Sequence, residues 1–204
     1  MRKGGIIAIG IDEGDILMDV KLTHGTEHDE AGNVTVPGDD VVLITREGMS
    51  IRFSESEIRS MGRAASGVRG IRLEKTDAVV AAAVIVPDAT LLVASENGIG
   101  KRTDFGEYRV QSRGGKGIIT MKTNEKTGNV VGSLTVQDND EIMLITVGGQ
   151  MVRISVRGIR EAGRNTQGVK LIDLSESDKL QAIARVISEE KDEDEAEPAT
   201  ESPS

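Results

Sequence analysis

Short runs of aliphatic and β-branched residues, separated by glycines and polar turns, recur along the chain. In the middle of the sequence, runs at Val68–Leu73 and Val79–Val86 are followed by runs at Leu91–Ser95 and Ile99–Thr103. The last two are separated by Glu96-Asn97-Gly98, and Asn-Gly between two β-rich runs is a strong hairpin signal. The pattern therefore predicts four short strands in this stretch.

The four-strand pattern occurs three times. Hairpin glycines spaced by 50 and 51 residues mark the copies, at Gly48, Gly98 and Gly149. Further residues recur at fixed offsets from them, in the aligned sets Arg52, Arg102 and Arg153; Arg59, Arg109 and Arg160; Arg63, Arg113 and Arg164; and Gly67, Gly117 and Gly168. This agreement indicates an internal repeat of about 50 residues.

A repeat with four strands is typical of a propeller blade, which buries its apolar faces against neighbouring blades. The predicted repeats span roughly 5–66, 67–116 and 117–167, and a partial repeat at 168–187 holds two more apolar runs. We expect an all-β, propeller-like fold of about three and a half repeats, either an open arc or a truncated piece of a larger ring. In the first repeat, His24–Asp40 predicts an inserted surface loop.

Composition limits the core and the function class. Aromatic residues make up 1% of the chain, namely Phe53, Phe105 and Tyr108, so the core must be aliphatic. The 24 glycines fit frequent tight turns. The absence of cysteine excludes disulfides and thiolate metal sites. No apolar run is long enough for a membrane span and no signal-peptide core is evident, so we expect a cytoplasmic protein without a membrane partner.

The net charge of −9 is unevenly distributed along the chain. Residues 188–204 contain eight acids and one lysine, a charge of −7, and we expect them to form a disordered acidic tail. Residues 1–187 then carry only −2. The global charge therefore does not describe the folded part.

Within the folded part, the segments that follow each hairpin are basic. Residues 48–72, 98–117 and 149–170 carry +3, +3 and +4, whereas residues 6–47 and 73–97 carry −8 and −3. Equivalent positions of stacked blades lie at equivalent radii, so a basic belt along one rim is expected, suited to a continuous path of phosphates. The candidate DNA-binding residues are Arg52, Arg59, Arg63, Lys101, Arg102, Arg109, Arg113, Lys116, Arg153, Arg160 and Arg164.

The same arginines have a structural alternative. They could cap carbonyl groups at blade edges or pair with Glu57 and Glu107. Surface ion pairs contribute only about 0–1 kcal/mol, which favours the DNA hypothesis for the set. Because aromatic residues are so scarce, base stacking is not expected, and contact with the backbone of duplex DNA remains.

No catalytic residue is predicted in the chain. Tyr108 occupies the repeat position of Ile58 and Ile159 and is interpreted as a packing residue. His24 and His28 lack a third firm ligand, so no metal site is expected. The sequence contains neither a P-loop nor a set of residues for nucleophilic catalysis, and a propeller enzyme is disfavoured.

One segment resembles a known family motif. Gln111-Ser112-Arg113-Gly114-Gly115-Lys116-Gly117 matches six of seven positions of the Gln-Arg-Arg-Gly-Gly-Lys-Gly box of DNA gyrase A subunits. The stretches 61–73 and 163–169 are similar to later repeats of the same domain. The chain therefore resembles the C-terminal domain of a type IIA topoisomerase A subunit over residues 1–187.

This resemblance implies a β-pinwheel, a six-bladed relative of the propeller whose blades exchange strands and whose outer surface wraps DNA. It implies a DNA gyrase A subunit that works with a gyrase B subunit in an A2B2 complex, with ATP and Mg2+ bound only in other parts. This chain itself needs no cofactor. Two departures are present: the box lies in a middle repeat, and Ser112 replaces an arginine. The alternatives are the topoisomerase IV A-subunit domain and a protein-interaction propeller with no DNA role.

Overall fold

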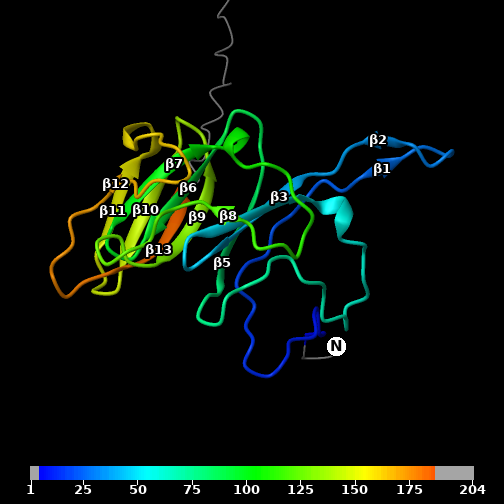
Figure 1. The fold of residues 1–204 in the computed structure, drawn as a ribbon, viewed down its shortest axis with the longest axis horizontal. Helices are drawn as coiled ribbons and strands as arrows, with labels where there is room; N and C mark the ends of the chain where they lie inside the picture. The colour runs from blue at the N-terminus through cyan, green and yellow to red at the C-terminus, as the bar shows by residue number, and fades with distance from the viewer. Residues whose placement is uncertain (1–4, 187–204) are drawn as a thin grey trace, which may run out of the picture.

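The computed structural model describes residues 5–186, and its regular structure is almost entirely β (Figure 1). Three short 3-10 turns each follow a hairpin: η1 (Glu55–Glu57), η2 (Phe105–Glu107) and η3 (Val156–Gly158). The strands are β1 (Glu27–His28), β2 (Val34–Val36), β3 (Asp40–Thr45), β4 (Met49–Ser54), β5 (Val79–Val84), β6 (Thr90–Ser95), β7 (Ile99–Asp104), β8 (Ile118–Ile119), β9 (Val130–Val136), β10 (Glu141–Thr146), β11 (Met151–Ser155), β12 (Val169–Lys170) and β13 (Leu180–Val186).

Three antiparallel sheets form the body of the molecule. Sheet I has the order β5-β3-β4-β8, sheet II the order β9-β6-β7-β12, and sheet III the order β13-β10-β11. Each sheet is built on the hairpin of one repeat, and a strand from the next repeat pairs on its inner side. Sheets I and II also receive a two-residue strand from the repeat after that. The blades therefore exchange strands, as the resemblance implies.

The hairpins and the strands beside them confirm the sequence pattern. β5, β6 and β7 agree with the predicted runs to within two residues at each end. The hairpin glycines adopt the left-handed backbone that the tight turns require, with φ of 82°, 73° and 84° at Gly48, Gly98 and Gly149. The predicted strand at Val68–Leu73 is wrong, because this segment has no strand partner among the described residues and forms no ladder.

Apolar residues alternate along the outer sheets and run continuously through the middle one. Val42 and Ile44 of sheet I face Leu91 and Val93 of sheet II in one cluster with the ring of Tyr108. The intervening Leu92 and Ala94 face sheet III on the other side. Since sheet II is covered on both faces, every residue from Leu91 to Ser95 is buried. Stacking of the three sheets thus forms the predicted aliphatic core.

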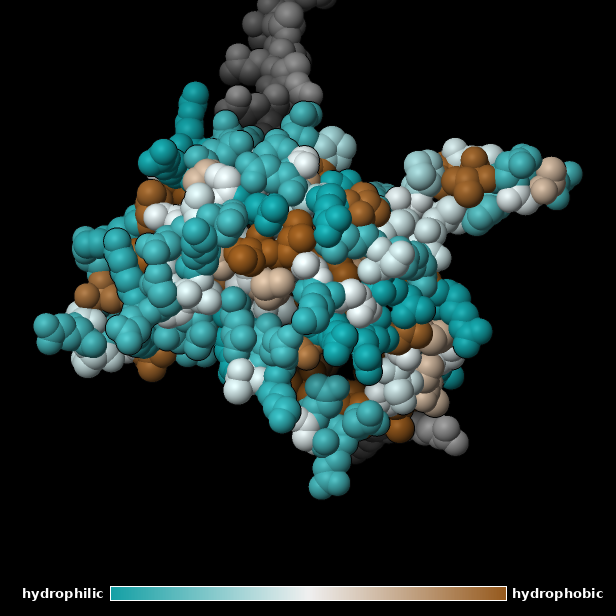
Figure 2. Space-filling model, in the orientation of Figure 1, coloured by the Kyte–Doolittle hydropathy of each residue, from teal (hydrophilic) through white to brown (hydrophobic). Residues whose placement is uncertain are grey.

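The inserted segment is exposed as predicted, but it is a β-hairpin rather than a plain loop. β1 and β2 pair and project from the body as an arm, seen to the right in Figure 1. Its root is fixed by Glu55, whose carboxylate accepts hydrogen bonds from the backbone N–H groups of Gly25 (3.0 Å) and Asp39 (2.6 Å). Val34 and Val36 on the arm remain exposed, and apolar patches are visible there in Figure 2.

Some expectations lie outside the described residues. These are the disordered acidic tail at 188–204 and the last residue of the predicted final strand, Ile187. Within residues 5–186, no helix has the length and apolar character needed to cross a membrane.

Candidate nucleic-acid interface

After its 3-10 turn, each repeat contributes a segment that we call a strap, at residues 55–73, 105–122 and 156–172. The second strap follows the outer edge of β4: Gln111 donates its N–H to the carbonyl of Arg52 (2.8 Å), and β8 pairs with Met49 and Ser50. The third strap follows β7 in the same way, with the N–H of Ala162 bonded to the carbonyl of Arg102 (2.9 Å). The second and third straps therefore form the rim of sheets I and II. The first strap lies beside the second, joined to it by backbone hydrogen bonds from the N–H of Gly114 to the carbonyl of Gly70 and from the N–H of Arg72 to the carbonyl of Gly115.

Arg52 and Arg102 tie these straps to the sheets beneath them. Arg52 pairs with Asp40 (2.7 Å) and donates to the carbonyls of Phe105 and Tyr108 at 3.1 Å each. Arg102 is buried, donates to the carbonyl of Ile159 (3.0 Å) and pairs with Asp138. Both guanidinium groups are occupied inside the molecule, so this geometry favours the structural alternative for these two arginines.

Arg153, their counterpart in sheet III, has a different environment. It lies on β11, which among the described residues carries no strap on its outer edge. Its guanidinium pairs with Glu141 on the neighbouring strand, and half of the side chain is exposed. This pair raises the pKa of Arg153 further above its usual value. The same repeat position is thus internal in two blades and external in the third.

Arg113 and Arg164 brace neighbouring straps. Arg113 donates from its side chain to the carbonyls of Glu57 (3.0 Å) and Arg69 (3.2 Å), and Arg164 donates to that of Ile119 (2.9 Å). The carboxylates of Glu57 and Glu107 accept hydrogen bonds from the backbone N–H groups of these two arginines, at 3.0 and 2.9 Å. Both arginines remain half-buried, with part of each side chain open to solvent.

Lys101, predicted from the sequence to lie on the basic rim, is fully buried and does not reach the rim surface. Its ammonium group donates to the carbonyls of Gly163 (2.6 Å) and Arg164 (2.5 Å) and to the hydroxyl of Thr166 (3.0 Å). Burial lowers the pKa of Lys101 from its usual 10.5 to about 8, an effect opposed by Glu107 and strengthened by Arg164.

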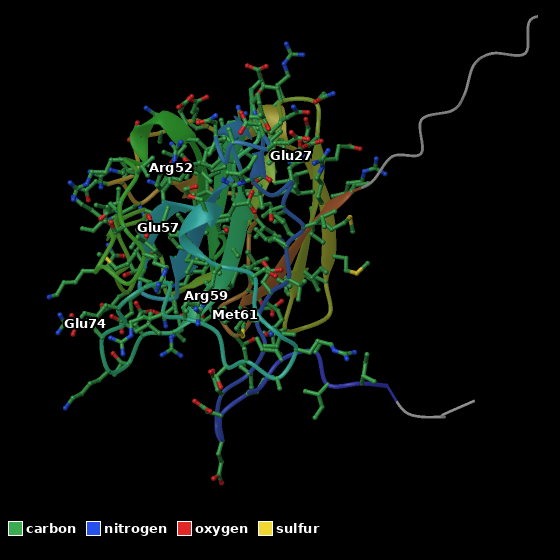
Figure 3. All side chains as sticks on the ribbon, turned by 90° about the vertical axis from the view of Figure 1, so that its right-hand side faces the viewer. Glu27, Arg52, Glu57, Arg59, Met61 and Glu74 are labelled. Atoms are coloured by element: carbon green, nitrogen blue, oxygen red, sulfur yellow. The ribbon has the colours of Figure 1, made fainter. Side chains whose placement is uncertain are left out.

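The remaining predicted residues are exposed on the straps. Arg59, Arg109 and Arg160 occupy equivalent positions shortly after each 3-10 turn, and all three are exposed. Figure 3 shows Arg52 on its strand and Glu57, Arg59 and Met61 along the strap that follows. Arg63 is also exposed, and Lys116 makes only a 3.7 Å surface contact with Glu74. These five cations are available to a ligand.

Further exposed strap cations, beyond those predicted from the sequence, are Arg69, Arg72, Lys122, Arg157 and Lys170. They lie in the straps but not at offsets shared by all three repeats, which is why the repeat alignment missed them. Together the straps contain twelve Lys and Arg residues against four Glu, a net charge of +8. The rim is therefore strongly basic although the chain is acidic.

The box-like segment lies in the second strap, pressed against sheet I. Gly117 has φ of 75°, and a Cβ there would meet the carbonyl oxygen of Ser50 at 2.2 Å, so only glycine allows this approach. Beneath the segment, Tyr108 is buried and its hydroxyl hydrogen-bonds Thr120 (2.7 Å). Burial raises the pKa of Tyr108 and supports its interpretation as a packing residue.

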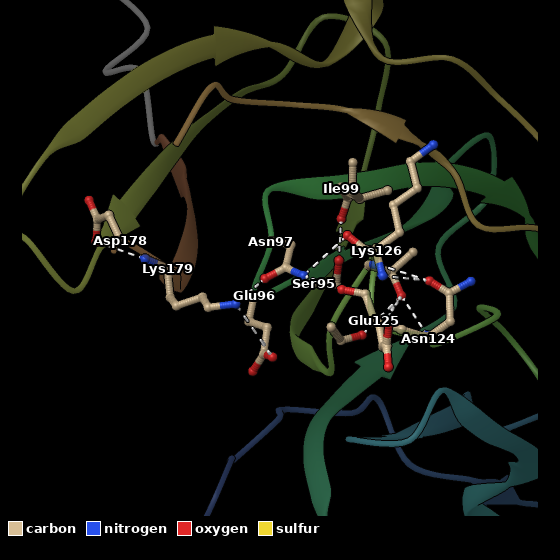
Figure 4. A network of polar contacts seen from close by, with 11 residues as sticks. Ser95, Glu96, Asn97, Ile99, Asn124, Glu125, Lys126, Asp178 and Lys179 are labelled. Atoms are coloured by element: carbon tan, nitrogen blue, oxygen red, sulfur yellow. Dashed lines mark hydrogen bonds and ion pairs between the residues drawn. The ribbon is translucent and has the colours of Figure 1, made fainter. Parts of the chain in front are cut away.

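The hairpin tips of the blades are not basic. At the tip of sheet II, Asn97 donates its amide to the carbonyls of Glu125 (2.9 Å) and Lys126 (3.1 Å), and Lys179 reaches Asn97 and Glu96 (Figure 4). These contacts tie later turns to the hairpin. They leave the rim as the surface where cations accumulate.

No constellation for metal binding emerges from the part of the chain that the structure describes. No group of three or more His, Cys, Asp or Glu side chains is arranged there for a metal ion. His24, one of the two histidines, contacts Asp39 at the root of the arm (3.0 Å).

The sequence matches the family described as "DNA gyrase C-terminal domain, beta-propeller" over residues 1–24, 39–85, 89–137 and 140–187. It is 44% identical to the DNA gyrase A subunit of Mycolicibacterium smegmatis over 96% of this chain and 22% of that protein. It is 42% identical to the DNA gyrase A subunit of Escherichia coli K12 over 95% of this chain and 21% of that protein. The chain thus spans about a fifth of the curated relatives it matches.

Two solved structures have a similar fold. A DNA gyrase A C-terminal domain superposes with a TM-score of 0.69 and 25% identity, over 79% of this chain and 57% of that one. The C-terminal domain of DNA topoisomerase IV gives a TM-score of 0.68 and 27% identity, over 72% of this chain and 46% of that one. The arm at 25–38 lies outside the residues matched to the family.

Proposed function

The chain belongs to the family of DNA gyrase C-terminal domains, and from this premise we propose that its straps bind and bend duplex DNA without sequence preference. The observation that carries the proposal is the set of exposed cations at Arg59, Arg109 and Arg160, repeated from strap to strap on one rim. Phosphates follow one another along a duplex, so a periodic row of cations matches a backbone and not a base sequence.

The proposed DNA-contact surface contains only some of the residues that the sequence predicted to bind DNA. It consists of the exposed strap cations and the half-buried Arg113 and Arg164. Arg52, Lys101 and Arg102 serve the fold, because their charged groups are bonded to carbonyls inside the molecule. Arg153 lies on the edge of sheet III and pairs with Glu141.

Bending requires many such contacts. Curving 20–30 base pairs costs on the order of 1–6 kcal/mol, which a single strap cannot supply. Three straps with a net charge of +8 offer a continuous track over which that cost is distributed. The scarcity of aromatic side chains leaves no platform for stacking unpaired bases.

In the whole enzyme, we infer that this wrapping supports ATP-dependent negative supercoiling by an A2B2 complex of gyrase A and gyrase B subunits. ATP, Mg2+ and the cleavage chemistry would belong to other parts of that complex, and the straps of this chain would hold the DNA segment in position. The support is the 40–44% identity to several DNA gyrase A subunits.

Charge reversal at matched sites tests the proposal. R109E/R160E removes two strap cations, and K75E/K126E makes the same change in net charge near the hairpin tips. A phosphate-tracking rim predicts that the slope of log K against log salt becomes less steep by about 1.8 for the strap variant only, two contacts at about 0.9 each. Equal effects of the two variants would reduce the interaction to net charge and contradict the proposed track.

The structural match to a topoisomerase IV C-terminal domain is the observation behind a second candidate function, as part of the A subunit of that enzyme. Supercoiling assays of the whole enzyme separate the two, because only a wrapping domain supports introduction of negative supercoils into relaxed DNA. A protein-interaction role would show a shallow salt dependence for DNA together with a saturable protein ligand.

A further inference from the structure

Lys101 is an unusual residue for a domain core. Its side chain is fully buried, and its ammonium group contacts two backbone carbonyls and a hydroxyl of one short loop, Gly163–Thr166. None of these three partners is a carboxylate. A buried ammonium is costly unless its hydrogen bonds are satisfied, so the three contacts are what allow a lysine at this position.

The equivalent position in sheet I is Ile51, and the loop above it is different. There the strap has Gly114 and Gly115 in place of Asn165 and Thr166. Gly114 has φ of 78°, and an ideal Cβ on Gly115 would lie 3.5 Å from the Ile51 side chain. Asn165 does not adopt a positive φ. The glycine loop thus packs on an apolar side chain, whereas the Arg-Asn-Thr loop folds around an ammonium group.

We propose that Lys101 is the positioning residue that fixes the loop 163–168 for contact with the DNA backbone; this rests on the proposed function. In a planar trans peptide the carbonyl and the following N–H point in opposite directions. Because the carbonyl of Arg164 turns inward to Lys101, the N–H of the exposed Asn165 points away from the core. The buried cation therefore presents a backbone donor beside Arg164, and a phosphate oxygen accepts such donors.

The fixed loop also holds the cation beside it. The N–H of Arg164 is bound by Glu107 (2.9 Å), and its guanidinium reaches the carbonyl of Ile119 on the second strap (2.9 Å). The N–H of Lys122 on the second strap donates to the carbonyl of Thr166 (2.9 Å). Lys101 thus lies below the point where the second and third straps meet, and its contacts set the spacing of strap cations there.

The charge state of Lys101 gives the proposal a distinctive readout. An ammonium group donates three hydrogen bonds, and a neutral amine donates two, so deprotonation removes one contact with the loop. Glu107 and Arg164 are the charged groups that act on Lys101, with opposite effects on its pKa, and burial brings that pKa to about 8. DNA phosphates do not titrate near this pH. We expect the DNA affinity of the unaltered chain to fall between about pH 7 and 9.

Two variants of the full chain test the assignment. K101I places the sheet I residue under the unaltered loop, and K101I/N165G/T166G also supplies the two glycines that fit it; N165G/T166G with Lys101 retained is the control. K101I is expected to speed amide hydrogen exchange in residues 163–168 and weaken DNA binding by about two- to tenfold, the effect of one hydrogen bond. It should also abolish the pH dependence. The double glycine change should restore loop protection.

Separate measurements test the positioning role of Lys101 and the proposed DNA binding. Hydrogen exchange is measured without DNA, so it tests Lys101 even if the chain binds no DNA, in which case the proposed function fails alone. Unchanged exchange and affinity in K101I overturn the positioning role. Failure of the two glycines to restore protection in K101I/N165G/T166G overturns it too, because the loss would then come from the core and not from the fit between side chain and loop.

Discussion

Replacing the repeated arginines one at a time distinguishes an arginine that stabilises the fold through internal hydrogen bonds from one that lies exposed on the surface. Arg52, Arg102 and Arg153 share one repeat position, and methionine keeps the aliphatic stem while removing the guanidinium. In R102M the lost contacts are the hydrogen bond to the carbonyl of Ile159 (3.0 Å) and the pair with Asp138. The strap itself keeps its backbone bonds to residue 102.

The expected cost follows from what each contact leaves behind. A hydrogen bond from a charged donor contributes about 1.5–3 kcal/mol, and the carbonyl of Ile159 loses its charged partner. Asp138 is 73% exposed and is solvated again by water, so its pair adds only about 0–1 kcal/mol. R102M should therefore lower the free energy of unfolding by about 1.5–4 kcal/mol. R52M loses two carbonyl contacts and should cost at least as much. R153M loses one surface pair, about 0–1 kcal/mol.

Urea denaturation of the three variants measures this order, and DNA titration of the folded proteins completes the test. R102M should bind DNA with the salt slope of the unaltered chain, because the Arg102 guanidinium that it loses is buried and does not reach the surface. The reasoning is refuted if R153M is as destabilising as R102M. It also fails if R102M leaves stability unchanged while making the salt slope shallower, which would return Arg102 to the DNA-binding surface.

Three further changes probe the strap, the buried lysine and the arm. G117A should lower the free energy of unfolding, measured in urea, by about 2–4 kcal/mol, because φ is 75° at Gly117 and a Cβ there would collide with the carbonyl of Ser50. The control G158A, with open space around the residue, should change the free energy of unfolding by no more than about 0.5 kcal/mol. Equal effects of the two variants would contradict the close packing at Gly117. The pKa of Lys101 is about 8 in the folded chain, below its value in the unfolded chain, so the unfolded chain binds more protons between about pH 8 and 10.5. The stability of the unaltered chain relative to K101M should therefore rise with pH over this window. A fall would contradict burial as the cause of the lowered pKa. Replacing residues 26–37 of the arm by a short Gly-Ser turn should change the unfolding free energy by no more than about 0.5 kcal/mol, since the contacts of Glu55 with Gly25 and Asp39 remain, and a loss above about 2 kcal/mol would show that the arm packs on the body.

Local structure was predictable from the sequence because local signals define it. The Asn-Gly turn between two β-rich runs predicted β6 and β7, and the period of about 50 residues predicted the stacked sheets. The pairing between repeats was not visible in the residues. Val68–Leu73 has the composition of a strand, yet a strand also needs a partner, and no strand among the described residues pairs with this segment.

The site was predictable as a region and less so as a set of residues. The repeat identified the rim segments and the exposed Arg59, Arg109 and Arg160. Residues that make packing contacts recur in a repeat as regularly as residues that bind a ligand, so Arg52 and Arg102 were also predicted to bind DNA. For Lys101 a usable signal existed. Its counterparts Ile51 and Val152 are apolar, and an apolar residue at the same position in the other copies indicates that the side chain points inward.

Strand exchange between repeats also determines the order in which the sheets can be completed during synthesis on the ribosome. The β3–β4 hairpin ends at Ser54, yet the strand that closes its outer edge begins only at Ile118, after the whole second hairpin has been made. At about 5–20 residues per second, sheet I waits on the order of several seconds with its edge unpaired. An unpaired edge is a template for aggregation, so a nascent chain stalled between these two points would be the state in most need of a chaperone.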